Sequence, residues 1–399
     1  MSALPPNINL RDLVVKKVGY MPNLNPRTQN LSRGFAAFLS PPEPDVIRFT
    51  VGQPDFDTPK GVVDAAKASM DRGETTYTRS QGSEELCEAV SKHLQRYKID
   101  YPGIDVVITP GCKQAILYGL MATIEPGDEV ILFAPAWPSY DPMVRMLGGV
   151  PIHVPVHREN YHPDIEATRA AVNEKTKMII LNSPNNPTGA VYTRDEIKAL
   201  VDIAEENDLW IMDDMIYANM TWMDWPYTSP AEFENGKDRT MIIGGWSKTW
   251  AMTGWRLGWI TGPEEFMTSV KSIQTNAATH AVTFLMPAAV EAFNQMDEVK
   301  KMRDSFEQRK GLIHSLLSEI PGLNCPEPEG AFYALVDVTG TGMTDMEFAN
   351  RALKEARVQL IPGSLMEGGE GLVRMSYANS SDNIKEGCRR LKEWLASLD

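Results

Sequence analysis

The chain has 399 residues and a mass of 44.4 kDa, and its hydrophobic content of 43% is enough for a buried core in about two to three domains. A formal net charge of −14 and a pI near 5.0 argue against nucleic acid or an anionic membrane as the main partner. No apolar run reaches the roughly 18–20 residues that a membrane span requires, and residues 1–30 contain no apolar segment of the secretory kind.

Cysteine and histidine spacing indicates neither a disulfide framework nor a metal site. The four cysteines, Cys87, Cys112, Cys325 and Cys388, lie far apart and form no Cys-x-x-Cys pair. This pattern is typical of reduced thiols, so we expect a cytoplasmic protein. The six histidines form no His-Glu-x-x-His pair, and no metal ligands are expected.

The N-terminal part begins with an irregular segment. Residues 1–45 are rich in proline and asparagine, and we expect an arm with one short helix around Leu31–Phe38. A short strand is predicted at Ile47–Val51. The glycine and prolines of Gly52–Pro59 then predict a shaped loop that ends at a helix, with Thr58 as its N-cap. A plain turn is the alternative interpretation.

A possible anion-binding turn follows further along the chain. The loop at Tyr77, by itself a packing residue, precedes a helix predicted to run to about Tyr97. Asp105–Thr109 has the composition of a buried strand, and Gly111 lies in the turn between it and the predicted helix Gln114–Ile124. A small residue there leaves backbone N–H groups free for an anion, helped by the helix dipole. An ordinary strand-to-helix turn remains the alternative.

The next two predicted strands end in unusual sequences. Glu129–Ala134 is followed by Trp137, which suits either a core position or stacking on a bound ring. Lys177–Leu181 is followed by Asn182–Gly189, where two prolines and three asparagines force a sharp polar turn. A turn without a binding role is again the alternative.

Two adjacent carboxylates end the predicted strand Asp208–Asp214. Asp213 and Asp214 are followed, three residues beyond the second, by Tyr217. Paired acids at a strand end suggest a metal site or a charge directed at a bound cation. We favour the second interpretation, because no further ligand lies nearby in the sequence.

A lysine and an arginine lie between two short apolar strands, Met241–Gly244 and Leu257–Ile260. A buried lysine loses its proton easily, and a neutral amine condenses with an aldehyde to a Schiff base, a role that suits Lys248. The planar guanidinium of Arg256 suits a phosphate. Together these two groups match pyridoxal 5′-phosphate (PLP). A surface lysine and a solvent-directed arginine are the alternative.

The C-terminal third is predicted to alternate between helices and strands. Arg374 is of interest because an arginine among apolar strand residues is expensive unless it binds something or lies at an exposed edge. The predicted elements are a long connecting helix from about Ala288 to Ile320, a strand at Glu329–Asp337, a helix at Phe348–Ala356, a strand at Gly371–Ala378 and an amphipathic closing helix at Ser380–Leu398.

The order of these elements predicts an α/β fold. Strands that alternate with helices from about 105 to 262 indicate a mostly parallel sheet flanked by helices in a large domain. We expect a smaller α+β domain as well. The predicted division is an N-terminal arm that is also part of the small domain at 1–45, a large PLP-binding domain at 46–297 and a small C-terminal domain at 298–399.

Ser247-Lys248 followed by Gly254-x-Arg256-x-Gly258 resembles the lysine motif of the class I and II aminotransferases, the PLP fold-type I family. The resemblance covers roughly 30–395. The further matching motifs are Gly52-Gln53-Pro54-Asp55-Phe56, Gly111-Cys112-Lys113, Asn182-Ser183-Pro184-Asn185-Asn186-Pro187-Thr188-Gly189, Asp214-x-x-Tyr217 and Arg374-x-Ser376-x-Ala378. One departure is Gly245, where the family often has a serine that contacts the phosphate.

The resemblance implies a role for each matching residue. Lys248, Tyr77 and Asp214 are implied to be catalytic, with Lys248 holding PLP covalently and moving the proton. Tyr77 is implied to reach the cofactor phosphate of a neighbouring subunit, which would give a homodimer with shared active sites. The cofactor-binding set is Lys248, Gly111, Cys112, Lys113, Trp137, Asn186, Asp214, Tyr217, Ser247, Arg256 and Tyr77, and the substrate-binding set is Gly52, Lys113, Trp137, Asn186 and Arg374.

The function implied is amino transfer from an L-amino acid to a 2-oxo acid by a ping-pong mechanism. Gly111-Cys112-Lys113-Gln114-Ala115 resembles the thermophile-type aspartate aminotransferases, in which this lysine takes the distal carboxylate, so aspartate and 2-oxoglutarate are the expected pair. The alternatives are an aromatic, alanine or prephenate aminotransferase and a PLP-dependent β-lyase. A PLP-binding regulator is the non-enzyme alternative, and it would need a basic DNA-binding domain for which this acidic chain leaves no room.

Overall fold

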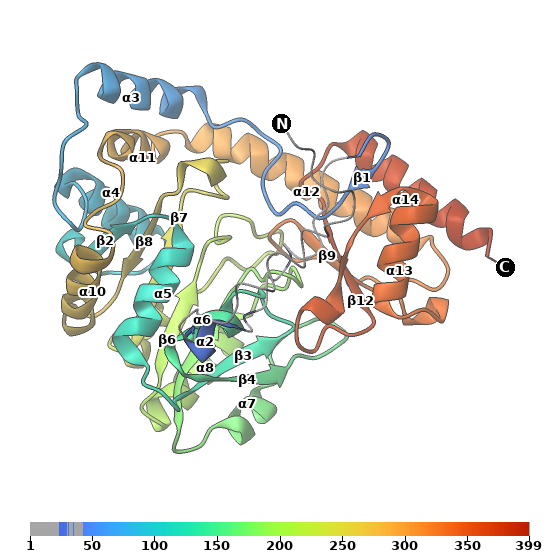
Figure 1. Cartoon of the computed structure of the whole chain (residues 1–399), viewed down its shortest axis with the longest axis horizontal. Helices are drawn as coiled ribbons and strands as arrows, with labels where there is room; N and C mark the ends of the chain where they lie inside the picture. Colours follow the sequence, from blue (N-terminus) through green and yellow to red (C-terminus); the bar gives the residue numbers. More distant parts are fainter. Residues whose placement is uncertain (1–23, 30, 32–34, 36–42, 399) are drawn as a thin grey trace, which may run out of the picture.

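A seven-stranded sheet forms the centre of the large domain (Figure 1). The structure is a computed structural model that describes residues 24–29, 31, 35 and 43–398. The sheet order is β2-β8-β7-β6-β5-β3-β4, and every neighbouring pair from β7 to β4 is parallel, whereas β8 runs antiparallel to both β7 and β2. The predicted mostly parallel sheet is therefore confirmed. The strands are β2 (Val106–Thr109), β3 (Glu129–Ala134), β4 (Val150–Pro155), β5 (Thr176–Leu181), β6 (Trp210–Asp214), β7 (Thr240–Gly245) and β8 (Gly258–Thr261).

Helices cover both faces of this sheet, which explains why its strands are almost continuously apolar. One face packs on α5 (Cys112–Thr123), α6 (Tyr140–Leu147) and α10 (Glu264–Ala277). The other face packs on six further helices of the described chain, of which α11 is the last along the sequence. These are α3 (Lys60–Asp71), α4 (Glu84–Leu94), α7 (Ile165–Ala171), α8 (Arg194–Glu206), α9 (Glu234–Lys237) and α11 (Met286–Ala292).

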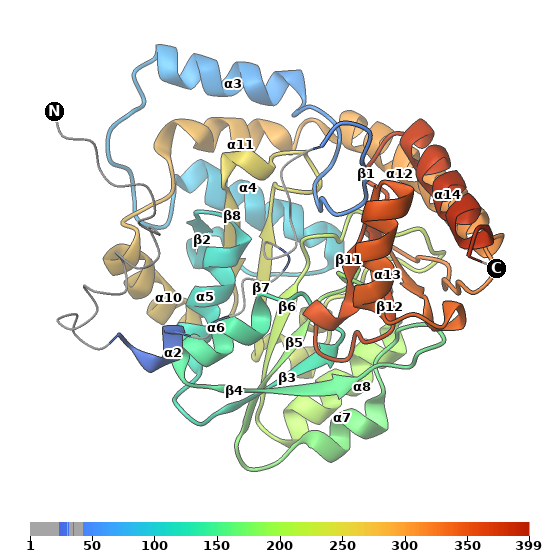
Figure 2. The same ribbon diagram turned by 45° about the vertical axis from the view of Figure 1, so that its right-hand side comes forward.

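Two small sheets lie in the C-terminal part, and one of them includes a strand from the N-terminal side of the chain. The strands β11 (Ile361–Pro362), β12 (Leu372–Ser376) and β9 (Tyr333–Asp337) form an antiparallel sheet in that order. A parallel pair joins β1 (Ile47–Arg48) to β10 (Val358–Gln359). The strands β1, β11 and β12 are labelled in Figure 2. The helices are α12 (Met296–Ser318), α13 (Asp345–Arg351) and α14 (Ser381–Ala396), and a short α2 (Pro26–Gln29) lies near the N-terminus.

The strand expected at Ile47–Val51 is shorter than predicted and lies elsewhere. Only Ile47 and Arg48 are in a strand, and they pair with β10 of the C-terminal part, not with the large sheet. The domain boundaries stay a prediction. The pairing nevertheless shows that the chain passes along the C-terminal part before it enters the large sheet.

Two helix predictions differ from the structure in detail. The long helix expected from Ala288 to Ile320 is two helices, because the chain leaves helical hydrogen bonding between α11 and α12. Thr58 is not a helix cap, since α3 begins at Lys60 and the Thr58 hydroxyl donates to the Ala251 carbonyl at 2.8 Å. The helix expected around Leu31–Phe38 lies largely outside the described residues.

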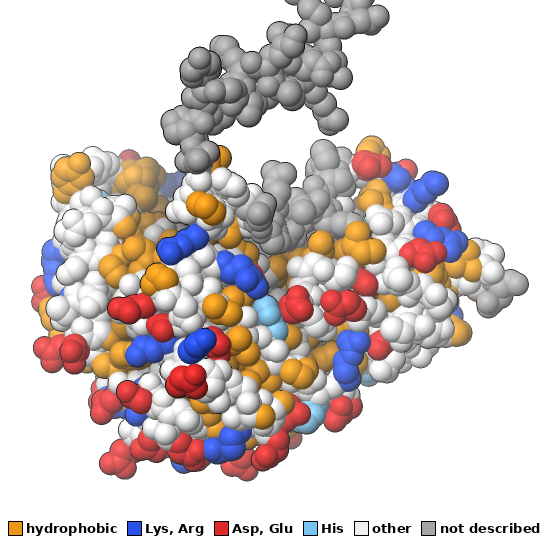
Figure 3. Space-filling model, turned by 60° about the horizontal axis from the view of Figure 1, so that its bottom comes forward, with side chains coloured by type: hydrophobic (Ala, Val, Ile, Leu, Met, Phe, Trp, Pro, Cys, Tyr) orange, Lys and Arg blue, Asp and Glu red, His pale blue; other side chains and the backbone are white. Residues whose placement is uncertain are grey.

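The surface carries charges of both signs. On the face shown in Figure 3, acidic and basic side chains are interspersed. Within the described ranges, no helix is long and apolar enough to cross a membrane.

Candidate active site

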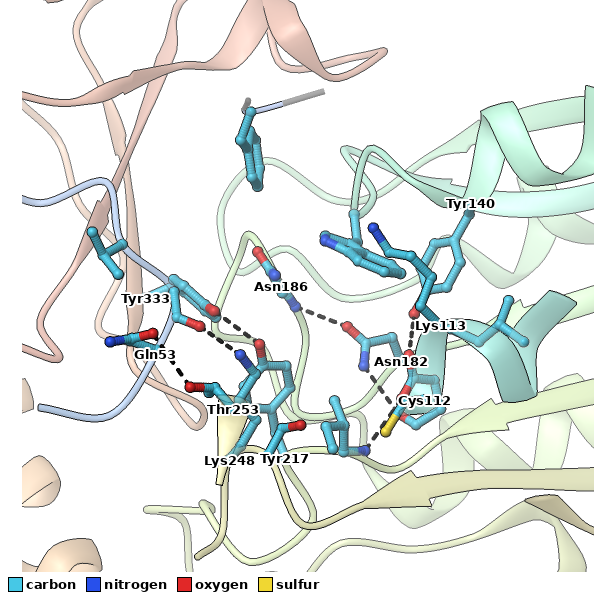
Figure 4. Close-up of a pocket in the computed structure, with 18 of the residues that line it drawn as sticks. Gln53, Cys112, Lys113, Tyr140, Asn182, Asn186, Tyr217, Lys248, Thr253 and Tyr333 are labelled. Carbon is cyan, nitrogen blue, oxygen red and sulfur yellow. Dashed lines mark hydrogen bonds between the residues drawn. The ribbon is translucent and has the colours of Figure 1, made fainter. Parts of the chain in front are cut away.

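A cavity of about 440 Å³ lies at the carboxyl ends of the parallel strands, where open α/β sheets bind ligands (Figure 4). The turns after β2, β3, β5, β6 and β7 all contribute to its wall, and β9 and β12 contribute from the C-terminal part. The lining residues are Phe35, Thr50, Val51, Gly52, Gln53, Cys112, Lys113, Ile116, Trp137, Tyr140, Asn182, Asn186, Asp214, Ile216, Tyr217, Ser247, Lys248, Thr253, Arg256, Tyr333 and Arg374.

An anion cradle is formed where the turn after β2 meets Arg256. Gly111 has a φ of 87°, which favours glycine, and a Cβ there would lie 2.4 Å from Nη2 of Arg256. The Arg256 guanidinium donates to the Thr253 carbonyl at 3.1 Å and has no carboxylate partner in the described part of the chain. The first N–H groups of α5 lack intrahelical acceptors and lie beside it. Together they suit a phosphate.

Gly245, the departure from the family motif, is explained by Cys112. The Cys112 thiol donates to the Gly244 carbonyl at 3.0 Å, and a Cβ at position 245 would lie 2.5 Å from its sulfur. A Cβ at Gly258 would lie 2.5 Å from the Cys112 backbone nitrogen. The thiol therefore occupies the space that a serine at position 245 would need.

The Lys248 amine lies in the cavity and donates to the Gly52 carbonyl. Burial, above all, lowers the pKa of this amine from 10.5 to about 8, and the positive charges of Arg374 and Arg256 act in the same direction. About 10% of the amine is then neutral at pH 7, against about 0.03% for an ordinary lysine. Lys248 is thus prepared to act as a nucleophile and as a base.

Asp214 is the carboxylate that lines the cavity. Its Oδ2 accepts from the Tyr140 hydroxyl at 2.6 Å, and its Oδ1 accepts from the Ile216 N–H at 3.3 Å. Burial raises the pKa of Asp214 to about 6, so the carboxylate is largely charged at neutral pH. The group suits a protonated ring nitrogen.

Asp213 points away from the cavity and bonds to other partners. Its Oδ2 accepts from the Tyr227 hydroxyl and, at 2.7 Å, from the Ser229 hydroxyl. The two carboxylates therefore do not form one site. No group of three or more potential metal ligands occurs among the described residues.

Arg374 is the most buried cation of the site, at 2% exposure. It donates through Nη1 to Asn186 Oδ1 at 3.0 Å and through Nη2 to the Thr50 carbonyl at 2.8 Å. Its Nε has no partner among the described residues, and no carboxylate pairs with it there. Phe35 and Tyr333 contact the guanidinium with their rings, 4.0 Å and 4.7 Å from Cζ. Such an arginine is suited to an incoming carboxylate.

Lys113 and Trp137 form another part of the wall. The Lys113 ammonium lies 4.9 Å from the Trp137 ring centre and donates to the Ser139 hydroxyl at 3.2 Å. Partial burial, and then Arg256, lower the pKa of Lys113. No carboxylate pairs with Lys113 in the described ranges, which leaves its charge available to a ligand.

Two of the predicted site residues are not in the lining. Gly111 lies behind Arg256 and shapes the cradle from there. Tyr77 is 87% exposed and contacts the His280 ring edge-on, so within one chain it does not reach the cavity. All the other predicted residues line the cavity together, although they come from distant parts of the sequence.

Several lining residues were missed from the sequence. Asn182 opens the recognised polar turn and donates to the Asp214 carbonyl at 2.9 Å, and Tyr140 follows Trp137 by three residues. Both could have been found from these neighbours. Tyr333, Phe35 and Gln53 carried no signal of their own, because their position depends on how the C-terminal part and the N-terminal segment pack on the sheet.

The cavity fits PLP by its charge. Lys113, Lys248, Arg256 and Arg374 are cations without carboxylate partners among the described residues, against the one lining carboxylate of Asp214. A ligand with a phosphate, a ring nitrogen and an aldehyde satisfies the cradle, Asp214 and Lys248 in turn. A substrate carboxylate satisfies Arg374.

Residues 44–391 match the family described as aminotransferase class I and II. The chain belongs to this family. It is a PLP-dependent aminotransferase of fold type I, as its motifs predicted.

Three relatives illustrate the range of names in this family. The chain is 36% identical over 363 residues to a probable aspartate/prephenate aminotransferase of Aquifex aeolicus, covering 89% of this chain and 92% of the relative. It is similar to the solved aspartate aminotransferase of Thermus thermophilus with maleate, with a TM-score of 0.88, 33% identity and coverage of 94% and 100%. The aromatic aminotransferase of Pyrococcus horikoshii OT3 gives a TM-score of 0.87, 35% identity and coverage of 91% and 98%.

Proposed function

We propose that this aminotransferase uses aspartate as its amino donor and 2-oxoglutarate as its acceptor. The observation that carries the proposal is the position of Lys113. Its unpaired ammonium and the buried Arg374 guanidinium line the same cavity, so a ligand with two carboxylates can engage both. A donor with one carboxylate leaves Lys113 unused. The printed names of relatives include aspartate as well as aromatic and prephenate enzymes, so the discrimination needs a direct test.

We assign the cofactor contacts as follows. Bound PLP supplies an electron-accepting ring that stabilises negative charge at the substrate α-carbon. Lys248 would hold it covalently, and the free amine of Lys248 would carry the α-proton as general base and acid. Asp214 would pair with the ring nitrogen, Tyr217 and Asn186 would donate to the ring oxygen, and Trp137 would pack against the ring. Phosphate contacts come from Arg256, Ser247 and the turn at Gly111 and Cys112, whereas Lys113 is left to the substrate.

The substrate contacts use the remaining lining groups. Arg374 binds the α-carboxylate with its planar fork, and Asn186, held by Arg374 at 3.0 Å, borders both cofactor and substrate. Gly52 keeps the floor beside this carboxylate free of a side chain. Two half-reactions on the same residues give a ping-pong cycle, in which the keto product leaves before the second substrate binds.

We further propose a homodimer with shared active sites. Tyr77 is exposed in one chain, and its assigned role is to reach the phosphate in the partner subunit. For the domains we keep the division into an arm at 1–45, a large domain at 46–297 and a small domain at 298–399. The cavity would then lie between the large and the small domain. We place the protein in the cytoplasm.

Replacement of Lys113 by serine tests the substrate assignment. A charge-assisted contact in a closed site is worth about 2–5 kcal/mol on truncation, or about 30- to several-thousand-fold in kcat/KM. We expect a loss of that order with aspartate and little change with phenylalanine or alanine. Lys175→Ser, at an exposed lysine outside the cavity, is the matched control and should change neither.

The pattern of losses separates the alternatives. Equal losses with acidic and neutral donors would mean that Lys113 serves the cofactor or the fold, and the aspartate assignment would be wrong. A wild-type preference for phenylalanine over aspartate would favour an aromatic aminotransferase, for which the rings of Phe35 and Trp137 offer a surface.

A further inference from the structure

Tyr333 lies between the residues assigned to the substrate and those assigned to the cofactor. It is 1% exposed and lines the cavity from the start of β9 (Figure 4). On the neighbouring strand β12, Arg374 is opposite Leu335. Tyr333, two residues before Leu335, is therefore on the same face of the small sheet as Arg374. The sequence marked this residue only as part of a strand.

Three contacts fix the Tyr333 side chain. Its hydroxyl lies 2.8 Å from the Tyr217 hydroxyl, and the Arg374 guanidinium carbon lies 4.7 Å from its ring centre. The hydroxyl also fills the space beside Gly52, since a Cβ at that glycine would lie 2.5 Å from the Tyr333 oxygen. The Tyr333 ring thus contacts Arg374, the residue assigned to the substrate carboxylate, and its hydroxyl contacts Tyr217, the residue assigned to the cofactor.

Counting protons gives the direction of the hydrogen bond. Each tyrosine hydroxyl has one proton. If Tyr217 donates its proton to the ring oxygen of PLP, as proposed above, its own oxygen is left as an acceptor. The Tyr333 hydroxyl must then be the donor of the 2.8 Å bond.

We propose that Tyr333 is a positioning residue, which donates to Tyr217 and thereby directs and strengthens the donation of Tyr217 to the cofactor. This inference rests on the proposed function. A hydroxyl that accepts a hydrogen bond becomes a better donor, because hydrogen bonds in a chain polarise one another. Burial raises the pKa of the Tyr333 hydroxyl, and the charge of Arg374 beside the ring opposes this rise because it stabilises the phenolate. The cation therefore makes the Tyr333 hydroxyl a stronger donor than burial alone would leave it.

Tyr333 connects Arg374, which is assigned to the substrate carboxylate, with Tyr217, which is assigned to the cofactor. The guanidinium is held between the Phe35 and Tyr333 rings, and Tyr333 passes the influence of this charge to Tyr217. Loss of the Tyr333 hydroxyl alone should weaken the stabilisation of negative charge on the cofactor ring oxygen. Loss of the whole ring should in addition loosen Arg374.

The test compares PLP-loaded wild type with Tyr333→Phe, Tyr217→Phe and Tyr161→Phe. Tyr161→Phe is a matched control, because its buried hydroxyl donates to the Leu335 carbonyl of the same strand at 3.3 Å but lies outside the cavity. The readout is the pKa of the visible absorption change as pH is varied, with thermal unfolding measured in parallel.

We expect Tyr333→Phe to raise that pKa by about 0.3 to 1, since charge on the ring oxygen is then less well stabilised, and Tyr217→Phe to raise it further. Tyr161→Phe should leave it unchanged. Tyr333→Leu should also raise KM for the carboxylate substrate above the value for Tyr333→Phe, because Arg374 loses its ring contact.

Two negative results are distinguishable. A pKa that moves in Tyr217→Phe but not in Tyr333→Phe would overturn this inference and leave the proposed function intact. The same rise in Tyr161→Phe as in Tyr333→Phe would also overturn it, because a general loss of packing would then be the cause. A pKa that does not respond even to Tyr217→Phe would refute the proposed role of Tyr217, and this inference with it.

Discussion

Replacing Lys248 by methionine should stabilise the PLP-free protein at neutral pH, although it removes the residue on which the chemistry depends. The folded chain lowers the pKa of this amine from 10.5 to about 8, mainly through burial. The folded state therefore holds the protonated amine less well than the unfolded chain does. Active-site groups often cost stability in this way.

The size and the pH range of the effect follow from that pKa. A fall from 10.5 to about 8 corresponds to about 3 kcal/mol, and the partial exposure of Lys248 reduces this to about 2–3 kcal/mol. The cost is complete below pH 8, where both states are charged. It shrinks as the pH rises from 8 to 10.5, because the folded chain releases the proton first, and it vanishes above 10.5.

A constant term opposes this gain. Methionine cannot donate to the Gly52 carbonyl, which costs about 1 kcal/mol at every pH. We therefore expect the variant to be about 1–2 kcal/mol more stable than wild type at pH 7 and slightly less stable near pH 10.5.

Urea unfolding of the two PLP-free proteins at equal concentration, between pH 7 and pH 10.5, measures this difference. Comparison at each pH removes the contributions of titrating groups that do not interact with Lys248, and Asp214, which does, titrates below this pH range. Lys175→Met, at an exposed position, should differ from wild type by a constant amount. A pH-independent difference for Lys248→Met as well would refute the depressed pKa and with it the argument that burial prepares this amine.

Two further predictions concern the phosphate cradle and the dimer. Gly245→Ser should weaken PLP binding at least about tenfold, because its Cβ would lie 2.5 Å from the Cys112 sulfur. A second change, Cys112→Gly, should recover part of the loss, since the Leu257 carbonyl oxygen would still lie 3.0 Å from that Cβ. Dissociation constants from fluorescence titration check this, and an equally weak double variant would count against the packing argument. A mixture of Lys248→Ala and Tyr77→Ala chains should regain activity after subunit exchange, since each mixed dimer has one intact site. Proven exchange without recovered activity would place Tyr77 outside the partner's site.

Local sequence signals determined the elements around the site. The apolar run Glu129–Ala134 is β3 with the predicted bounds, the strand that ends at Leu181 stops where the polar turn begins, and the next strand ends on the acid at Asp214, as predicted. Strand composition and turn residues act over a few positions, so they can be recognised without knowledge of the fold. The same holds for Lys248 and Arg256, whose chemistry is unusual in apolar surroundings.

Local sequence patterns predicted the structure less well where the same residues make contacts with distant parts of the chain. Thr58 has the side chain of a helix cap, but its hydroxyl is used by Ala251 and by the Trp255 indole N–H, at 2.8 Å and 3.1 Å. Ile47–Val51 has strand composition, yet most of it forms no ladder because its partner, β10, is two residues long. A partner about 300 residues away cannot be read from local pattern.

The electrostatics of the site were decided by the tertiary structure alone. The sequence supplied Lys248, Arg374 and Gly52, but the lowered pKa of Lys248 arises mainly from burial, and Arg374, which is distant in the chain, contributes together with the neighbouring Arg256. Tyr333 gained its place between Tyr217 and Arg374 only through the packing of the small sheet against the large one. Desolvation and charge interactions depend on distance in space, and a sequence specifies that distance only once it has folded.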